Sequence, residues 1–457
     1  VRLLGNALGD IIRIHDPEVF SSVEFLRAQG REWRKGKEHV KAFDSMVKEV
    51  ESYDAQKLLT VARAFTHFLA LSNSAENHHR IRRLRARMME TDTALSPKED
   101  SCSGTVRRLL ASKGKSKEEV YTALCKQSVE IVLTAHPTEV NRRTMLQKHE
   151  RISRALEGLD RADLTPYEQR NLTKELKREI SSIWETDELK RSKPTPVDEA
   201  TAGLHVVEEV LWHAVPDFLR KLDDICRTDL GKTLPLTVAP IKLASWMGGD
   251  RDGNPNVTPS TTRTVSFISR HVAAKLFLSD IRQLKTQLSM KRATDDVRAA
   301  AGNNSKEPYR AVLANLETKL EETALWARKG GLAVVIEKNI LTHTSQLMEP
   351  LKMMHASLVS IGRPEIADGM LTDTIRRLAA FGLALMPLDL RQESTRHSEA
   401  LDAITNYLGI GSYLAWDEET RRQWLCQEIA SKRPLLPKGI PIQKLGFSPT
   451  VRDTLGT

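Results

Sequence analysis

Several features that define particular classes of protein are scarce or missing in this chain. Its 457 residues include four cysteines, and these are far apart with no C-x-x-C pair, which argues against a zinc site or a disulfide framework. No run of about 18 apolar residues occurs, so we expect no membrane span. Aromatic residues make up 5% and charged residues 28%, a mix that favours long helices over a β-sandwich. We therefore expect reduced thiols, a cytoplasmic location and no membrane partner.

The charge balance is basic, with a formal net charge of +9, and much of the excess is local. Five arginines fall within the eight positions from Arg80 to Arg87. Such a run is compatible with a nucleic-acid-binding helix. No aromatic residues interleave with these arginines to stack on bases, so we favour a solvated helix end or a contact for an acidic partner, and expect no nucleic-acid partner.

Helical patterns dominate the chain. Residues 1–125 are predicted to form an N-terminal helical region, and 94–115, rich in breakers, a loop or domain joint. A capping box with proline at the first helical position marks a helix start at Thr165. Two apolar stripes are predicted to be buried: Leu58, Val61, Ala62, Phe65, Phe68 and Leu69 in the first region, and Leu172, Leu176, Ile180, Ile183 and Trp184 after Thr165.

Three short apolar runs have the character of buried strands, near residues 129–135, 241–246 and 383–390. Long helical stretches separate them, which predicts a parallel sheet with inserted helices. Each run ends in polar residues, and the carboxyl ends of parallel strands carry the functional groups in barrel enzymes.

The first run ends at His136, which Pro137 holds out of helical geometry. A single histidine is more often structural than catalytic. Its place at a strand end, followed by Arg142 and Arg143, suits acid/base chemistry on an anionic substrate, so the residues alone leave both interpretations open.

The second and third runs end at Trp246 and Arg391. The loop after Trp246 fits neither a calcium-binding loop nor a dinucleotide fingerprint, and we interpret most of its charges as a network that shapes the loop. The Trp246 indole could donate to a small oxyanion. Arg391 could bind a phosphate or carboxylate, or instead form a structural bridge to Asp389 or Glu393.

Four blocks in register resemble the phosphoenolpyruvate carboxylase family. The signature V-x-T-A-H-P-T-E-x-x-R-R spans residues 132–143, W-M-G-G-D-R-D-G-N-P spans 246–255, and L-D-L-R-Q-E-S spans 388–394. T-D-E at 186–188 with P-T-P at 194–196 is similar to a further family block. The resemblance covers the whole chain.

The resemblance implies a mostly α protein built on a (β/α)8 barrel, of which residues 126–457 would hold about the first three strands. It implies carboxylation of phosphoenolpyruvate by bicarbonate to oxaloacetate and phosphate. His136 and Arg391 would be catalytic, and Trp246 and Arg391 would bind substrate. Arg142 and Arg143 are similar to a sugar-phosphate activator site at a subunit contact, or have a structural role. A cytoplasmic homotetramer that uses Mg²⁺ or Mn²⁺ is expected.

Family members are about twice as long as this chain, and their metal ligands come later, so we expect none here. The chain begins at Val1 without methionine, and we expect both of its ends to be trimmed. A barrel with three strands would leave open edges, so we expect residues 1–457 alone to be inactive and unstable. The alternatives are a pyruvate-kinase-like enzyme that acts on enols and phosphates, and a regulatory homologue without activity.

Overall fold

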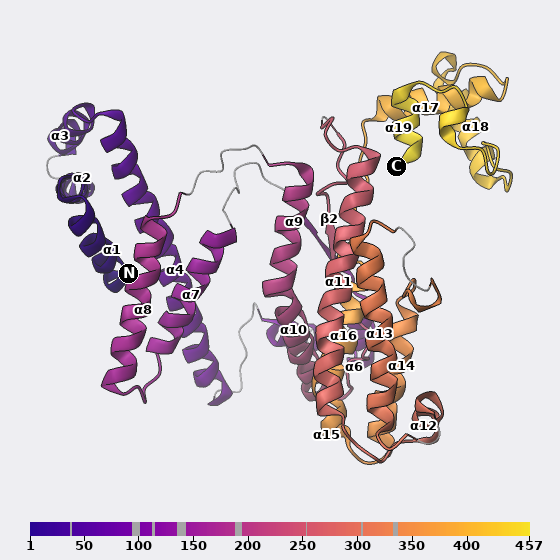
Figure 1. The fold of residues 1–457 in the computed structure, drawn as a ribbon, viewed down its shortest axis with the longest axis horizontal. Coiled ribbons are helices and arrows are strands. Elements are labelled where there is room, and N and C mark those ends of the chain that lie inside the picture. The colour runs from indigo at the N-terminus through magenta and orange to yellow at the C-terminus, as the bar shows by residue number, and fades with distance from the viewer. Residues whose placement is uncertain are drawn as a thin grey trace. The chain divides into compact units, whose positions relative to one another are not determined.

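The computed structural model of the chain describes residues 1–36, 39–93, 101–111, 115–134, 143–187, 194–252, 254–302, 305–331 and 337–457. These residues are mostly helical and include one short two-stranded parallel sheet (Figure 1). They belong to two compact units, Val1–Pro97 with Thr138–Ser192, and Lys98–Pro137 with Lys193–Thr457. Over the same described ranges, we find no helix with the length and apolar character needed to cross a membrane.

The first unit is entirely helical in the part described. The capping box at Thr165 begins α8 as predicted, and Leu176, Ile180, Ile183 and Trp184 of its predicted stripe are buried, while Leu172 is half-buried. The helices of this unit are α1 (Arg2–His15), α2 (Pro17–Lys35), α3 (His39–Glu51), α4 (Ala55–Thr93), α7 (Arg143–Leu159) and α8 (Pro166–Trp184).

The apolar stripe predicted for α4 is confirmed in part, because Val61 is buried and Phe65 and Phe68 are half-buried against the core of this unit. Leu58 and Leu69 of that stripe are 45% and 60% exposed, whereas Ala64 and Leu71, which were not predicted, are buried. Helices α1, α2 and α7 pack against α4, so its buried face follows their positions rather than the largest apolar side chains.

The basic run of α4 is partly paired within the same unit. Arg85 forms an ion pair with Glu157 of α7 at 2.8 Å, and Arg82 and His78 lie 3.4 and 2.8 Å from Asp160. These pairs agree with the interpretation of this run as a solvated, packed helix end.

The second unit contains the sheet and the remaining helices. Helix α5 lies within residues 94–115, where a loop was predicted, so that expectation was wrong for residues 102–111. The helices and strands of the second unit are α5 (Cys102–Ala111), α6 (Lys117–Lys126), β1 (Val129–Leu133), α9 (Pro196–Val206), α10 (Trp212–Ile225), β2 (Ile241–Ser245), α11 (Pro259–Gln287), α12 (Asp295–Ala301), α13 (Pro308–Arg328), α14 (Ser345–Ser360), α15 (Pro364–Ala367), α16 (Met370–Phe381), α17 (Ser394–Tyr407), α18 (Glu418–Ala430) and α19 (Pro449–Gly456).

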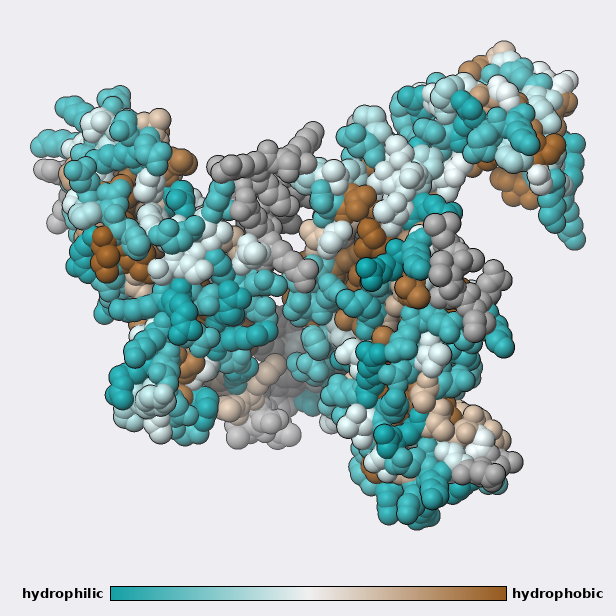
Figure 2. All heavy atoms as spheres, viewed as in Figure 1, coloured by the Kyte–Doolittle hydropathy of each residue, from teal (hydrophilic) through white to brown (hydrophobic). Residues whose placement is uncertain are grey.

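Five-residue π-helical turns, Val207–Leu211 and Cys226–Leu230, precede and follow α10. Short 3-10 turns cover Glu337–Asn339, Tyr413–Ala415 and Ile442–Lys444. Helices α11 and α13 lie side by side, and α10, α14 and α16 complete the core with them (Figure 1). The face shown in Figure 2 is mostly hydrophilic, with hydrophobic residues in limited groups.

The sheet is smaller than the sequence predicted. Strands β1 and β2 are parallel and pair from Val129 with Ile241 to Leu133 with Ser245. The third predicted strand, 383–390, does not form as a strand in the described structure. The backbone turns at Leu385, whose φ is 58°, and only Leu388 and Arg391 form isolated parallel bridges, to Ser245 and Asp250. The described residues therefore show two strands and an extended segment beside them, not a barrel.

Candidate active site

Three segments of the second unit end side by side. β2 lies between β1 and the extended segment 387–391. On one side, the Trp246 amide donates to the Leu133 carbonyl at 3.1 Å. On the other, the Ser245 amide donates to the Pro387 carbonyl at 3.0 Å, and the Asp389 amide to the Ser245 carbonyl at 2.9 Å. The side chains that follow these segments are thereby gathered at one edge of the sheet, the usual place for a site in parallel α/β proteins.

The glycine pair after Trp246 lets two backbones approach closely. The Arg391 amide donates to the Gly249 carbonyl at 3.1 Å, and the Arg251 amide donates to the Arg391 carbonyl at 2.9 Å. A Cβ atom on Gly249 would lie 2.3 Å from the Asp389 carbonyl oxygen, which only glycine avoids. The loop is therefore bonded directly to the segment that carries Arg391.

Trp246, Arg391 and Asp389 form a cluster that we call the site triad. The guanidinium carbon of Arg391 lies 4.1 Å from the centroid of the Trp246 ring, a cation–π contact. The Trp246 indole donates through Nε1 to Oδ2 of Asp389 at 3.0 Å. Trp246 is half-buried, while Arg391 and Asp389 are exposed. The guanidinium is thus held by an aromatic face.

Arg391 keeps its hydrogen-bonding capacity. Among the residues that the structure describes, no carboxylate lies within ion-pair distance of its guanidinium, so neither Asp389 nor Glu393 forms the structural bridge that we considered. Guanidinium presents planar N–H donors that match phosphate and carboxylate oxygens. The arrangement suits an exposed binding group for an oxyanion.

The structure brings together two of the five predicted site residues, Trp246 and Arg391. His136 and Arg142 lie outside the described residues, and Arg143 is the first residue of α7 but its side chain is not described. β1 ends at Leu133, whose carbonyl is bonded to Trp246, and His136 follows three residues later in the sequence.

Sequence reasoning missed Asp389 as a member of the site. Side chains two residues apart on an extended segment share a face, so Asp389 and Arg391 could have been paired from their spacing. Its partner Trp246 is 143 residues away, and no local pattern identifies it. The indole N–H, which we expected to meet an oxyanion, is bonded to this carboxylate.

The charged loop after Trp246 is held mainly by backbone groups. Arg251 donates through Nε to the Val257 carbonyl at 2.9 Å, and through Nη1 to the Asp453 carbonyl of α19, also at 2.9 Å. The Asp252 amide bonds the Asp250 carboxylate at 3.3 Å. Arg251 therefore shapes the loop, although through carbonyl groups instead of the expected charge network.

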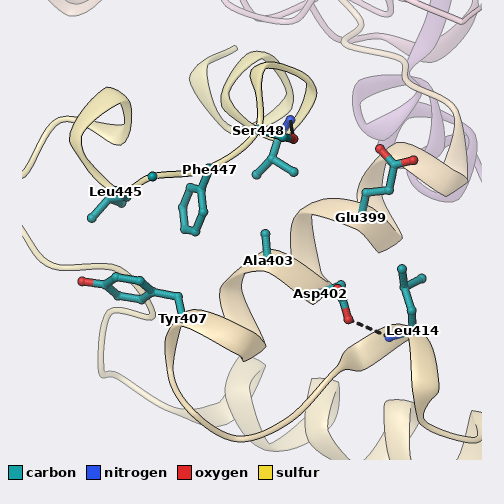
Figure 3. A pocket seen from close by; sticks show the side chains of 10 residues that line it. Glu399, Asp402, Ala403, Tyr407, Leu414, Leu445, Phe447 and Ser448 are labelled. Carbon is teal, nitrogen blue, oxygen red and sulfur yellow. Dashed lines mark hydrogen bonds between the residues drawn. The ribbon is translucent and has the colours of Figure 1, made fainter.

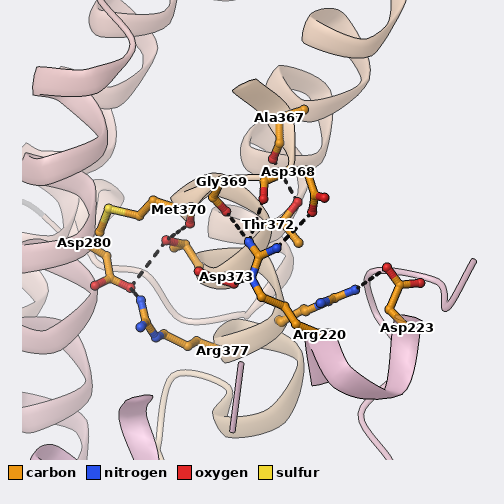
Figure 4. Close-up of polar contacts among 12 residues, drawn as sticks. Arg220, Asp223, Asp280, Ala367, Asp368, Gly369, Met370, Thr372, Asp373 and Arg377 are labelled. Atoms are coloured by element: carbon orange, nitrogen blue, oxygen red, sulfur yellow. Dashed lines mark hydrogen bonds and ion pairs between the residues drawn. The ribbon is translucent and has the colours of Figure 1, made fainter. Parts of the chain in front are cut away.

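A second cluster of the same three residue types lies in the helical core. The guanidinium carbon of Arg377 lies 5.2 Å from the Trp212 ring centroid. Its Nη1 lies 2.9 Å from Oδ2 of Asp280 (Figure 4). All three residues are buried. Burial raises the pKa of Asp280, while the charge of Arg377 and hydrogen bonds from Arg377, Trp212 and Thr374 act in the opposite direction. We call this set the core triad.

One cavity of the second unit is poorly suited to an anionic substrate. A cavity of about 480 Å³ lies between α17 and the segment before α19 (Figure 3). Tyr407 and Phe447 flank it with ring centroids 5.9 Å apart, and Asp402 accepts from the Leu414 amide at 3.1 Å. None of the described residues that line it is basic.

The described ranges do not offer a site for a divalent metal. Within them, no group of three or more His, Cys, Asp or Glu side chains is arranged to hold a metal ion. Mg²⁺ and Mn²⁺ require several oxygen ligands around one point. These residues therefore do not fit such a cofactor by themselves.

Comparisons with known proteins agree with one another. A family model described as phosphoenolpyruvate carboxylase matches residues 1–457. The phosphoenolpyruvate carboxylase of Acinetobacter baumannii is 41% identical over 465 residues, which cover 100% of this chain and 51% of that protein. Those of Pseudomonas aeruginosa and Hahella chejuensis are both 43% identical, over 96% of this chain and 49% of each protein. The chain spans about half the length of the curated relatives it matches.

Proposed function

Because the chain belongs to the phosphoenolpyruvate carboxylase family, we propose that the protein containing it carboxylates phosphoenolpyruvate with bicarbonate to give oxaloacetate and phosphate. The observation that carries this proposal is the exposed guanidinium of Arg391, held on the Trp246 ring at the edge where three segments end. Such a group can bind the phosphoryl oxygens of a small anionic substrate.

The reaction begins with transfer of the phosphoryl group from phosphoenolpyruvate to bicarbonate, which forms carboxyphosphate and the enolate of pyruvate. Arg391 binds the phosphoryl oxygens and stabilises the negative charge that builds on them. His136 then removes the carboxyl proton of carboxyphosphate, which breaks into carbon dioxide and phosphate. The enolate carbon attacks the carbon dioxide and forms oxaloacetate. Trp246 contributes a wall of the bicarbonate pocket.

The fold is part of the same proposal. β1, β2 and the segment 387–391 would be the first three strands of a (β/α)8 barrel, with residues 1–125 as a helical region before it. The exposed side chains of Val129 and Ile131 on β1, each 46% accessible, support a further layer against this strand. The rest of the length found in the relatives would supply that layer.

The remaining properties follow from family membership and stay proposals. They are a Mg²⁺ or Mn²⁺ cofactor with ligands outside this chain, a homotetramer, and a cytoplasmic location. An anion site at Arg142 and Arg143 is proposed for a sugar-phosphate activator, with a structural role as its alternative. Incubation with phosphoenolpyruvate and ADP separates this function from a pyruvate-kinase-like one, since only the latter would produce ATP.

The test of the function uses His136→Asn in a protein of the relatives' full length. We expect loss of oxaloacetate, with bicarbonate-dependent cleavage of phosphoenolpyruvate to pyruvate and phosphate continuing, because phosphoryl transfer precedes the step assigned to His136. His343→Asn, at an exposed histidine before α14, is the control and should carboxylate normally. Carboxylation at the normal rate in His136→Asn would exclude the role given to this residue. Oxaloacetate formation by residues 1–457 alone would refute the expectation that they are inactive.

A further inference from the structure

We infer that Asp389 is a positioning residue for Arg391, acting through the Trp246 ring. Its carboxylate accepts the indole N–H and so fixes the aromatic face on which the guanidinium lies. This inference rests on the proposed function, because it concerns how the phosphate-binding group of that reaction is oriented. It assigns Trp246 a role through its ring face, since its N–H is bonded to Asp389 at 3.0 Å.

The backbone of Trp246 is already fixed, which leaves its side chain as the variable part. Its amide donates to Leu133 at 3.1 Å, and its carbonyl accepts from Gly249 and Asp250, each at 2.9 Å. The ring is only half-buried, so packing restricts its rotamer less than it would in a fully buried ring. In the described structure, the bond to Asp389 is the polar contact of this side chain.

Asp389 is itself well placed to serve as an anchor. Its amide donates to the Ser245 carbonyl at 2.9 Å, so its backbone is tied to the residue that precedes Trp246. Two hydrogen bonds therefore connect β2 to the indole: one from the Asp389 amide to the Ser245 carbonyl, and one from the Trp246 indole to the Asp389 carboxylate. A displacement of about 1 Å at a substrate-positioning group can reduce turnover by about 100-fold, so such an anchor has a kinetic consequence.

The carboxylate acts on Arg391 without pairing with it. A hydrogen bond to an anion makes the indole a stronger donor of electron density, and cation–π attraction depends on the negative face of the ring. The arginine is thereby held in place with its N–H groups open. In the core triad the arginine does pair with the carboxylate, because Asp280 bonds the guanidinium of Arg377 directly at 2.9 Å. A direct bond at Asp389 would compete with a phosphoryl oxyanion for the same donors.

The experiment compares Asp389→Ala, Asp389→Asn and Glu393→Ala in the full-length protein. Asparagine keeps an oxygen that accepts the indole N–H, whereas alanine does not. Glu393 is an exposed carboxylate two residues after Arg391, as Asp389 is two residues before it, and has no bond to Trp246 in the described structure, so it is the matched control. We expect Asp389→Ala to lower kcat about 10- to 100-fold and Asp389→Asn to recover most of the loss, with Glu393→Ala unchanged.

Two further measurements separate positioning from general damage. With fluorotryptophan labelling, the Trp246 ¹⁹F resonance, assigned by its loss in Trp246→Phe, should move or broaden in Asp389→Ala and stay near its normal position in Asp389→Asn. Trp246→Phe keeps a ring face but lacks the N–H, so it should reproduce the kinetic loss, and the double variant with Asp389→Ala should be no worse than either single variant.

Each outcome is informative. A Trp246 resonance and kcat that are both normal in Asp389→Ala would overturn the inference, as would additive losses in the double variant. A shifted resonance with normal kcat would show that the bond exists but does not position Arg391. If Arg391→Ala itself carboxylates normally, the proposed role of Arg391 fails, and this result is distinct because the ¹⁹F link between Asp389 and Trp246 would still be observed. Should Asp389→Ala fail to fold, Trp246→Phe carries the kinetic test.

Discussion

The site triad and the core triad contain the same three residue types in different surroundings. In the site triad, Asp389 bonds the Trp246 indole and Arg391 lies on the ring at 4.1 Å. In the core triad, Asp280 bonds the guanidinium of Arg377 directly, and the cation lies farther from its ring, at 5.2 Å. The two clusters differ in whether the arginine has a carboxylate partner.

Solvent exposure explains this difference. Asp280 and Arg377 are 5% and 8% exposed. An unpaired charge at that depth would cost several kcal/mol, so the two side chains form an ion pair with each other. Arg377 also donates through Nε to the Trp212 carbonyl at 2.8 Å. Arg391 is exposed, so water can solvate it and no internal partner is needed. The comparison indicates that an arginine on a tryptophan is available to bind a ligand only where water can also reach it.

The largest expected effect is on stability, from Arg377→Ala. Removal of this guanidinium leaves Asp280 buried without its cation, so we expect the free energy of unfolding to fall by about 3–5 kcal/mol. Denaturant unfolding monitored by circular dichroism measures it. Arg282→Ala is the control, because Arg282 pairs with Glu317 at 2.9 Å on the surface, where such a pair contributes less than about 1 kcal/mol. Equal losses in the two variants would contradict the distinction between buried and exposed pairs.

In a protein of the relatives' full length, Arg391→Ala should lower activity strongly and stability only slightly. We expect kcat for carboxylation to fall about 100- to 1,000-fold, as when one group that stabilises charge in a transition state is removed. The free energy of unfolding should change by less than about 1 kcal/mol, since the lost contact is an exposed cation–π pair. Steady-state kinetics and denaturant unfolding on the same preparation check both parts. A stable, fully active variant, or an unfolded one, would remove the contrast between the two arginines.

A third arginine on a tryptophan extends the comparison to pH. In the first unit, Arg63 lies 5.3 Å from the Trp184 ring centroid and donates to the Trp184 carbonyl at 2.7 Å. Burial, together with the charges of Arg63 and His149, lowers the pKa of His67 beside this ring from 6.5 to about 4. The buried titratable group in this cluster is the imidazole of His67, which is neutral in the folded protein. We therefore expect a fall in pH to weaken this cluster.

The direction in which stability changes with pH depends on whether the folded or the unfolded chain binds the proton of His67. Between pH 6.5 and about 4 the unfolded chain protonates His67 and the folded chain does not, so the stability it contributes above pH 6.5 is lost as the pH falls. The full loss is about 3 kcal/mol for a shift of this size. Unfolding of the normal protein and of His67→Gln should be compared at several pH values in this window. A difference between them that is independent of pH would contradict the assignment.

The smallest expected effect comes from the two tryptophans. Trp212→Phe removes a buried indole donor whose ring lies 4.9 Å from Phe277, so we expect a loss of about 1–3 kcal/mol in the free energy of unfolding. Trp246→Phe, at the half-buried site, should cost less than about 1 kcal/mol. Thermal unfolding of both variants measures the difference. The same loss in both would show that the N–H bonds of the two triads are energetically alike.

The parts of the fold that depend on local sequence were predictable. The capping box at Thr165 and the apolar runs of β1 and β2 were identified from neighbouring residues alone. The third strand failed because a positive φ at Leu385 turns the chain before Leu388 meets β2, and leucine gives no sign of such a turn.

The site was partly predictable for a related reason. Trp246 and Arg391 follow apolar runs, so their convergence could be expected from the position of strand ends. Asp389 could be assigned a partner only when the segments were seen side by side, because its bond to Trp246 spans 143 residues. The exposed members of the stripe predicted for α4 have the same origin, since some of the helices that pack against it come from distant parts of the chain.

The absence of a side chain at Gly249 sets the width of the site. With the Asp389 carbonyl 2.3 Å from where a methyl group would sit, even alanine would act as a wedge between the segment that carries the tryptophan and the segment that carries the arginine. The two backbones lie at hydrogen-bonding distance, because the Arg391 amide donates to the Gly249 carbonyl, and their spacing cannot increase without loss of that bond. Adaptation toward a larger substrate would therefore have to trim side chains around this edge, while the backbone spacing itself stayed constant.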